Sequence, residues 1–342
     1  MEYQVTWFVL WGVLWAVYFM LDGFDLGVGM LMNFIARSDG EKRLVINTIG
    51  PFWDGNEVWL ITAGGATFAA FPTTYAYMFS YLYPALLIIL FALIFRGVAF
   101  EFRGKGEGDK WKRSWDIAIF AGSSLPALLF GVAFGNIFRG LPIDASGYHG
   151  TLFSLLNPFG LLSGVFFVMM FLQHGALWLS IKTDGEVRAR AEKASSGLLY
   201  PVIFTAVIFL TATAFPSKFY DNFAKAPLLV AVPMLAVLGF AAAKFMTARG
   251  KWKGAFFASC ASIIAVMATG MISLYPNLIP SSIDPAHSLT IFNSSSSPYT
   301  LKIMTIVALL FVPVVIAYQF WVYRVLKGRL TVEGVVRDKH SY

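Results

Sequence analysis

The chain has 342 residues, of which 58% are hydrophobic and only 13% are charged, and its net charge is +7. An ordinary soluble domain carries about 25% charged residues, so this composition excludes a soluble enzyme, a nucleic-acid-binding domain and a disordered chain. It predicts a polytopic membrane protein whose solvent is mostly lipid. The single cysteine, Cys260, excludes an intrachain disulfide, a cysteine zinc ribbon and a cysteine-ligated iron–sulfur cluster.

Long apolar segments predict nine transmembrane helices, near residues 5–32, 51–71, 75–98, 115–135, 158–181, 198–215, 228–247, 255–275 and 301–324. The ambiguous segment is 58–95, which has no Asp, Glu, Lys or Arg over 38 residues. It contains Phe71-Pro72-Thr73-Thr74, a natural turn between helices. We therefore interpret it as part of a hairpin whose first helix starts near Pro51.

The loops between these spans alternate in basic charge. Twenty Lys and Arg residues, including Lys339 in the tail, fall in the loops of one side, whereas the other side has only Arg139, Lys218 and Lys225. The positive-inside rule then predicts that the N-terminus lies outside and the C-terminus in the cytoplasm. The first apolar segment lacks the basic start and the cleavage site of a signal peptide, so we expect it to be retained.

A weak internal repeat relates the two halves of the chain. The first span is followed by Asp39-Gly40-Glu41, and the fifth by Asp184-Gly185-Glu186, 145 residues later. Duplication is common in membrane folds. We expect one all-α integral-membrane domain over residues 1–342, made of two four-helix bundles, at about 5–135 and 158–275, plus a peripheral last helix at 301–324.

Charged side chains inside membrane spans are costly and therefore mark candidate functional sites. Asp22 and Asp25 are three residues apart on one helix face, which also carries Trp11, Trp15 and Tyr18, so this face is expected to point into protein. The next two spans add further charges near their cytoplasmic ends. The full set of candidates is Asp22, Asp25, Asp54, Glu57, Arg96 and Glu101.

Two interpretations of these charges stay open. In the first, Asp25 and Asp54, with Asp22 and Glu57 as neighbours, form a route by which protons enter from the cytoplasm. Asp25 and Asp54 then start neighbouring helices at similar depth and face each other. In the second, the carboxylates clamp the helices together, with Arg96 and Glu101 as structural charge partners.

Histidine is scarce in the predicted spans. His149 and His287 fall in outer loops, His340 is in the tail, and only His174 lies inside a span. A bis-His or His/Met haem site needs a coaxial pair of ligands, so we expect His174 to be a hydrogen-bonded interior residue. We expect no metal or cofactor bound directly by this chain, and any electron-carrying groups to belong to another chain.

Several segments resemble subunit II of the cytochrome bd-type quinol oxidases, and the resemblance extends from the N-terminus to the last helix. They are Asp22-Gly23-Phe24-Asp25-Leu26-Gly27-Val28-Gly29, Gly50-Pro51-Phe52-Trp53-Asp54-Gly55-Asn56-Glu57-Val58-Trp59-Leu60, Gly64-Gly65-Ala66-Thr67-Phe68-Ala69-Ala70-Phe71-Pro72, Phe95-Arg96-Gly97-Val98-Ala99-Phe100-Glu101-Phe102-Arg103 and Leu156-Asn157-Pro158-Phe159-Gly160-Leu161-Leu162.

The resemblance implies a complex in the bacterial cytoplasmic membrane that oxidises quinol and reduces oxygen to water, with proton uptake from the cytoplasm. It also implies that the partner, subunit I, carries the b-type and d-type haems and the quinol site. Subunit II would support that partner and help to deliver protons, a role that would fall on Asp25 and Asp54. A small accessory membrane subunit and membrane lipid are further expected partners, and nucleic acid is not.

Two rival functions belong to other classes. A secondary transporter would share the nine spans and the inner carboxylates, but it needs broken helices around a midplane site. In this chain Ser123-Ser124-Leu125-Pro126 is the candidate for such a break. The other rival is a purely structural membrane subunit.

Overall fold

The computed structural model describes residues 2–214 and 218–338, and it is built almost entirely of helices. Lys339, His340 and residue 215, the last of the predicted span 198–215, lie outside the described residues. The long helices are α1 (Glu2–Ile35), α3 (Trp53–Ala70), α5 (Tyr83–Phe102), α6 (Asp109–Arg139), α8 (Pro158–Lys182), α9 (Gly185–Thr213), α11 (Ala231–Ala248), α12 (Trp252–Leu274) and α13 (Pro298–Val325). The all-α class expected from the sequence is confirmed.

Shorter elements connect the long helices. The short α-helices are α2 (Asp39–Ile49), α4 (Pro72–Tyr81), α7 (Leu152–Leu155), α10 (Asp221–Lys225) and α14 (Val332–Arg337). The 3-10 helices are η1 (Arg103–Lys105), η2 (Pro227–Val230) and η3 (Pro285–His287). Two small antiparallel hairpins pair β1 (Ile143–Asp144) with β2 (Gly147–Tyr148), and β3 (Asn277–Ile279) with β4 (Leu289–Thr290).

Within the described residues, eight helices are long and apolar enough to cross a membrane: α1, α5 with η1, α6, α8, α9, η2 with α11, α12 and α13. The remaining long helix, α3, has 18 residues and is too polar to count among them, because it contains Asp54, Asn56 and Glu57. The turn predicted at Phe71-Pro72 is confirmed, since α3 ends at Ala70 and Pro72 begins α4.

One expectation about helix continuity is wrong, and one candidate break does not occur. The span predicted at 75–98 is divided at Leu82 into α4 and α5, because Pro84, in the first turn of α5, has no amide hydrogen to continue the helix behind it. In contrast, α6 is continuous through Pro126, so the chain does not break at Ser123-Ser124-Leu125-Pro126. The sign of a discontinuous transporter helix is therefore missing from α6.

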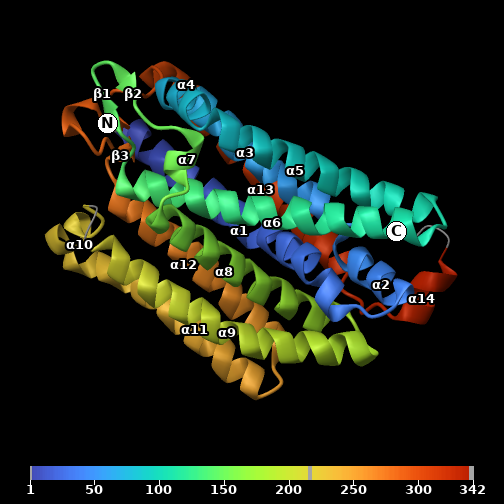
Figure 1. The fold of residues 1–342 in the computed structure, drawn as a ribbon. Helices are drawn as coiled ribbons and strands as arrows, with labels where there is room; N and C mark the ends of the chain where they lie inside the picture. Colours follow the sequence, from blue (N-terminus) through green and yellow to red (C-terminus); the bar gives the residue numbers. More distant parts are fainter. Residues whose placement is uncertain (1, 215–217, 339–342) are drawn as a thin grey trace.

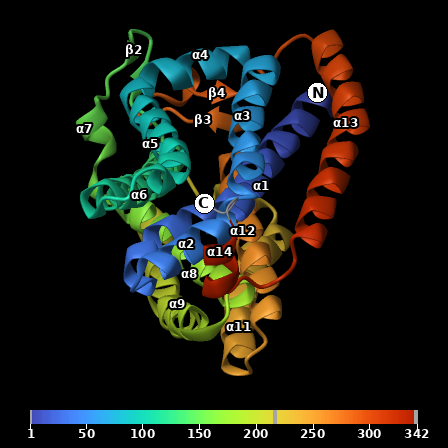
Figure 2. The same ribbon diagram turned by 90° about the vertical axis from the view of Figure 1, so that its right-hand side faces the viewer.

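Helix α1 runs through the middle of the molecule and contacts α3, α6, α8 and α12 (Figure 1). On one side of it, α5 packs on α6; on the other, α8 packs on α9, and α11 on α12. Helix α13 lies at the periphery, where it contacts α1 and α3, and Figure 2 shows it standing beside the bundle.

Glycines allow the central helices to approach closely. A Cβ atom at Gly27 of α1 would lie 1.9 Å from the carbonyl oxygen of Phe171 in α8, and one at Gly175 of α8 would lie 2.5 Å from the backbone of Gly27. The α6–α8 contact has the same character, because a Cβ at Gly131 would lie 2.7 Å from the Cα of Gly164. Such small-residue contacts hold membrane helices together through backbone van der Waals packing.

The two ends of the molecule differ. The start of α1, both β-hairpins, α4, α7 and α10 lie at one end, whereas α2 and α14 lie at the other (Figure 1). At the α2 end, α14 contacts α2, and Leu330 forms an isolated β-bridge with Thr183. The chain thus starts at one end and reaches α14 at the opposite end.

Candidate functional site: a buried ion cluster

Arg96 is the centre of a buried ion cluster formed by three helices. Its side chain is fully buried in α5, and its Nη2 atom lies 2.7 Å from Oδ1 of Asp22 in α1 and 3.7 Å from Oε2 of Glu57 in α3. Asp22 is also fully buried, whereas the Glu57 side chain is 19% exposed. The cluster therefore joins the first three long helices through charge and is open to the surface at Glu57.

Asp25 belongs to a separate polar chain that leads away from Arg96. It is fully buried, and its Oδ2 accepts a hydrogen bond of 2.7 Å from Nδ2 of Asn56. Oδ1 of Asn56 in turn accepts from Nε2 of Gln319, at 3.1 Å, and from the hydroxyl of Tyr323, at 2.9 Å. Asp25 is thereby connected through α3 to the last long helix, α13.

Several buried polar atoms in this region have no hydrogen-bond partner within the described chain. They include Oδ1 of Asp25 and both Nε and Nη1 of Arg96. Buried polar groups are normally paired. Oδ1 of Asp25 can therefore accept a proton or a hydrogen bond, whereas the two Arg96 nitrogens can only donate hydrogen bonds. The site thus contains a carboxylate whose second oxygen is available for proton exchange.

The structure brings some of the predicted site residues together and separates others. Asp22, Glu57 and Arg96 meet, as the clamp interpretation requires. Asp54 is exposed on α3, and the expected pairing with Asp25 is replaced by the Asn56 bond, because Asn56 is two residues further and lies on nearly the opposite side of the helix. Glu101 is also exposed and forms no ion pair with any described residue.

Sequence reasoning missed three members of the site. Asn56, Gln319 and Tyr323 carry no charge, so a search for charged residues in the spans does not find them. Gln319 nevertheless interrupts an apolar span, and Asn56 stands between the two carboxylates of α3. A count of all strongly polar residues in the spans finds both.

His174 is a buried residue with both ring nitrogens engaged. Nδ1 lies 2.9 Å from Oγ of Ser259 in α12, and Nε2 lies 3.0 Å from the carbonyl oxygen of Met20 in α1. Its ring also stacks on Phe256, with 4.6 Å between ring centroids. These contacts do not fit a haem ligand, because iron binding would need a free ring nitrogen directed into an open space.

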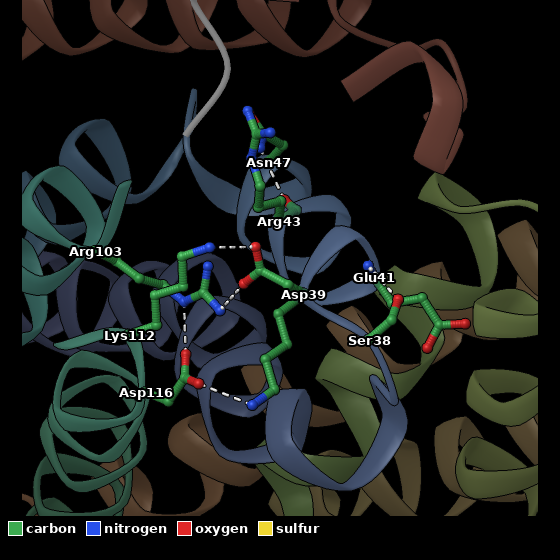
Figure 3. A network of polar contacts seen from close by, with 9 residues as sticks. Ser38, Asp39, Glu41, Arg43, Asn47, Arg103, Lys112 and Asp116 are labelled. Atoms are coloured by element: carbon green, nitrogen blue, oxygen red, sulfur yellow. Dashed lines mark hydrogen bonds and ion pairs between the residues drawn. The ribbon is translucent and has the colours of Figure 1, made fainter. Parts of the chain in front are cut away.

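A second ion network closes the α2 end of the molecule (Figure 3). Asp39 of α2 accepts from Arg103 at 2.7 Å and from Lys112 at 2.8 Å, and Asp116 of α6 accepts from Arg103 at 2.6 Å. Partial burial of Asp39 opposes ionisation, but the hydrogen bonds from Lys112 and Arg103 outweigh it and hold the pKa of Asp39 below its ordinary value. This network fixes α2 against η1 and the start of α6.

These observations define the class of the protein. It is an integral membrane protein in which apolar helices surround an arginine–carboxylate cluster whose central pair, Arg96 and Asp22, is fully buried. Such charges inside a membrane bundle are retained where they serve a proton or substrate path or hold helices in register.

Comparison with known proteins identifies the family. The model of the cytochrome bd terminal oxidase subunit II family matches residues 3–326. The chain is 39% identical to cytochrome bd-I ubiquinol oxidase subunit 2 of Escherichia coli, with 99% of both chains covered, and 39% identical to cytochrome bd ubiquinol oxidase subunit 2 of Bacillus subtilis, with 95% and 96% covered. The chain therefore belongs to the cytochrome bd terminal oxidase subunit II family.

The fold agrees with this assignment. A solved structure of the bd oxidase from Geobacillus thermodenitrificans contains a chain that superimposes on this one with a TM-score of 0.79. The match covers 95% of this chain and 98% of that chain, at 17% sequence identity. At that identity the match reports the helical architecture, which the two chains share over almost their whole length.

Proposed function

We propose that this chain acts as the second subunit of a quinol:oxygen oxidoreductase in the bacterial cytoplasmic membrane. Its relatives are named as subunit 2 of ubiquinol oxidases. The observation that carries the proposal is the full-length match to the subunit II family. In such a complex quinol is oxidised, oxygen is reduced to water, and protons are taken up from the cytoplasm. The transporter alternative is not favoured.

We infer a division of labour between the two large subunits. The b-type and d-type haems and the quinol site belong to a partner, subunit I, and this chain ligates no haem. The engagement of both His174 nitrogens by Ser259 and Met20 supports this division. A small accessory membrane subunit is a further proposed partner.

We also propose nine membrane crossings, with α3 as the ninth crossing helix. The opposite positions of the start of α1 and of α14 support an odd number of crossings (Figure 1). The distribution of basic loops supports an external N-terminus and a cytoplasmic C-terminus. On this topology α1, α3, α5 and α6 form one bundle, over about 5–135, and α8, α9, α11 and α12 the other, over about 158–275, with α13 peripheral.

Within the ion cluster, we assign different roles to the acidic residues. Asp22 lies 2.7 Å from Arg96, so it acts as the fixed counter-charge of a clamp. Asp25 accepts from a neutral amide and has an unpaired oxygen, so it can gain and lose a proton without breaking an ion pair. Asp54 is exposed, and Glu57 lies one turn further along α3, so the two form the entrance from the cytoplasm.

The experiment compares single amide variants in the purified complex. Asn keeps the shape of Asp but carries no proton, so Asp25→Asn and Asp54→Asn are expected to assemble with full haem content and to turn over more slowly. Glu186→Gln, on a side chain that is 83% exposed, is the control and should change neither property. Full turnover in both Asp variants would exclude the proton route, and loss of haem or of the partner subunit would indicate a clamp.

A further inference from the structure

A large apolar groove lies between α13 and the rest of the molecule. Its volume is about 1220 Å³, which exceeds the roughly 300–1,000 Å³ of ordinary small-molecule pockets. Side chains of α1, α3, α12 and α13 line it, and among them Val13, Ala66, Phe257 and Ile316 represent the four walls. Figure 2 shows the backbone of α13 standing to one side of the other long helices.

Hydrogen bonds hold α13 at the two ends of the groove. At the N-terminal end of α1, Trp7 Nε1 donates to the carbonyl oxygen of Leu301, at 3.1 Å, and to Oγ1 of Thr305, at 3.0 Å. Toward the other end, Trp59 Nε1 donates to Oε1 of Gln319, at 2.9 Å. Between these points α13 presents apolar side chains to the groove. Protein therefore bounds the groove along its length, and no ion pair among the described residues that line it closes either side.

The end of the groove nearest α14 is basic. Lys182, Lys253 and Lys327 all line it, and no carboxylate is among the lining residues. Lys182 is buried and donates to the carbonyl oxygens of Leu326 and Gly328, whereas Lys253 and Lys327 are exposed and form no ion pair with any described residue. A long apolar cavity with a cationic rim is complementary to an amphipathic anion.

We propose that this groove binds an anionic phospholipid, with its acyl chains between α13 and α1 and its phosphate at Lys253 and Lys327. Basic pockets between transmembrane helices are a general means of binding anionic headgroups at a membrane surface. The lipid stabilises α13 against the bundle, since the central part of this helix has little contact with the rest of this chain: only 6% of its most apolar stretch is buried within it. An amphiphile without an anionic group forms no ion pair with Lys253 or Lys327.

The test uses the intact oxidase complex, purified in detergent and washed free of lipid. Phosphatidylglycerol and the zwitterionic phosphatidylcholine are added separately, and binding is measured by native mass spectrometry and by the thermal unfolding midpoint. Phosphatidylglycerol should bind more tightly and raise the midpoint more. Lys253→Gln combined with Lys327→Gln should weaken its binding about fivefold for each lysine. Lys218→Gln combined with Lys225→Gln, at the opposite end, is the matched control and should bind as the wild type does.

A second pair of variants tests the groove itself. Ala308→Trp fills the groove from α13 and should abolish lipid binding, whereas Leu309→Trp, on a side chain that does not line it, should not. Equal binding of the two lipids, unchanged binding after either groove substitution, or recovery of a quinone or a partner helix in the groove would each overturn the proposal. These readouts do not depend on oxidase turnover.

Discussion

The two halves of the molecule share a way of packing but enclose different interiors. In the first half, Asp22, Glu57 and Arg96 bring charges together between α1, α3 and α5. In the second half, α8, α9, α11 and α12 surround a small apolar cavity of about 70 Å³, lined by aromatic residues such as Phe166, Phe209 and Phe240. Helix crossings with small residues therefore fix the architecture, while the Arg96 ion cluster occupies the first half.

The difference begins at the second helical segment of each half. In the first half the chain breaks after α2, at Gly50-Pro51, and a new helix starts at Trp53. In the second half α9 continues from Gly185 to Thr213 and passes through Pro201. The break places Asp54, Asn56 and Glu57 in the first turns of a new helix, where polar side chains are tolerated. The continuous helix α9 has only its own start at Gly185 and no second helix start after it.

The largest effect is expected from removing the cation of the charged half. Arg96→Leu leaves Asp22 and Glu57 without their partner, and loss of one member of a buried ion pair costs about 3–5 kcal/mol. The complex should lose yield and unfold at a markedly lower temperature. Arg139→Leu, on an exposed side chain, is the control, and Asp22→Asn added to Arg96→Leu should restore part of the stability. A stable Arg96→Leu complex would contradict the clamp.

The next effect tests the helix crossing that joins the halves. Gly27→Ala places a methyl group 1.9 Å from the Phe171 carbonyl oxygen, so α1 and α8 must separate. Overpacking of this kind costs about 1–3 kcal/mol, and it should lower the thermal midpoint. In Gly197→Ala, where an added Cβ meets nothing within 4 Å, the midpoint should stay or rise, because Ala favours the helix. Equal midpoints for the two variants would show that the crossing is not tight.

A smaller effect separates stability from turnover in the apolar half. Phe209 packs on Phe159 and Phe166, with ring centroids 5.4 Å and 5.9 Å away. Phe209→Leu should lower stability by about 1 kcal/mol and leave turnover per assembled haem unchanged. Asp25→Asn should leave stability unchanged and slow the turnover per assembled haem. Slow turnover in Phe209→Leu, measured as quinol oxidation per haem, would mean that both halves serve the reaction directly.

The smallest effect concerns acid and the α2 end. The pKa of Asp39 is lowered from its ordinary value of 3.8. Its bonds therefore add stability above pH 3.8, and this stability is lost as the pH falls through the lower pKa of the folded protein. The side chain is 44% exposed, so the contribution stays below about 1 kcal/mol. Thermal midpoints at pH 7 and pH 3 should differ less for Asp39→Asn than for the wild type, and an equal difference would rule out this contribution.

The sequence predicts the helical class, the break at Phe71-Pro72 and the position of Arg96, because apolar length, proline and an intramembrane charge are local signals. It predicts the site only in part. The Asp39–Arg103 and Asp25–Asn56 bonds join residues 64 and 31 positions apart, and helix rotation decides which side chains meet. The exposure of Asp54 depends on the start of α3, and a shift of one residue turns a helix face by about 100°.

The hydrogen bond from Trp7 to Leu301 has a consequence for the order in which the helices assemble during synthesis. Its two residues are separated by 294 positions, so the bond forms only after almost the whole chain has left the ribosome. Until then the side of α1 that α13 covers faces the bilayer, and lipid has access to it from the side. A chain truncated before Pro298 keeps that side open and leaves the indole nitrogens of Trp7 and Trp59 without their acceptors in α13.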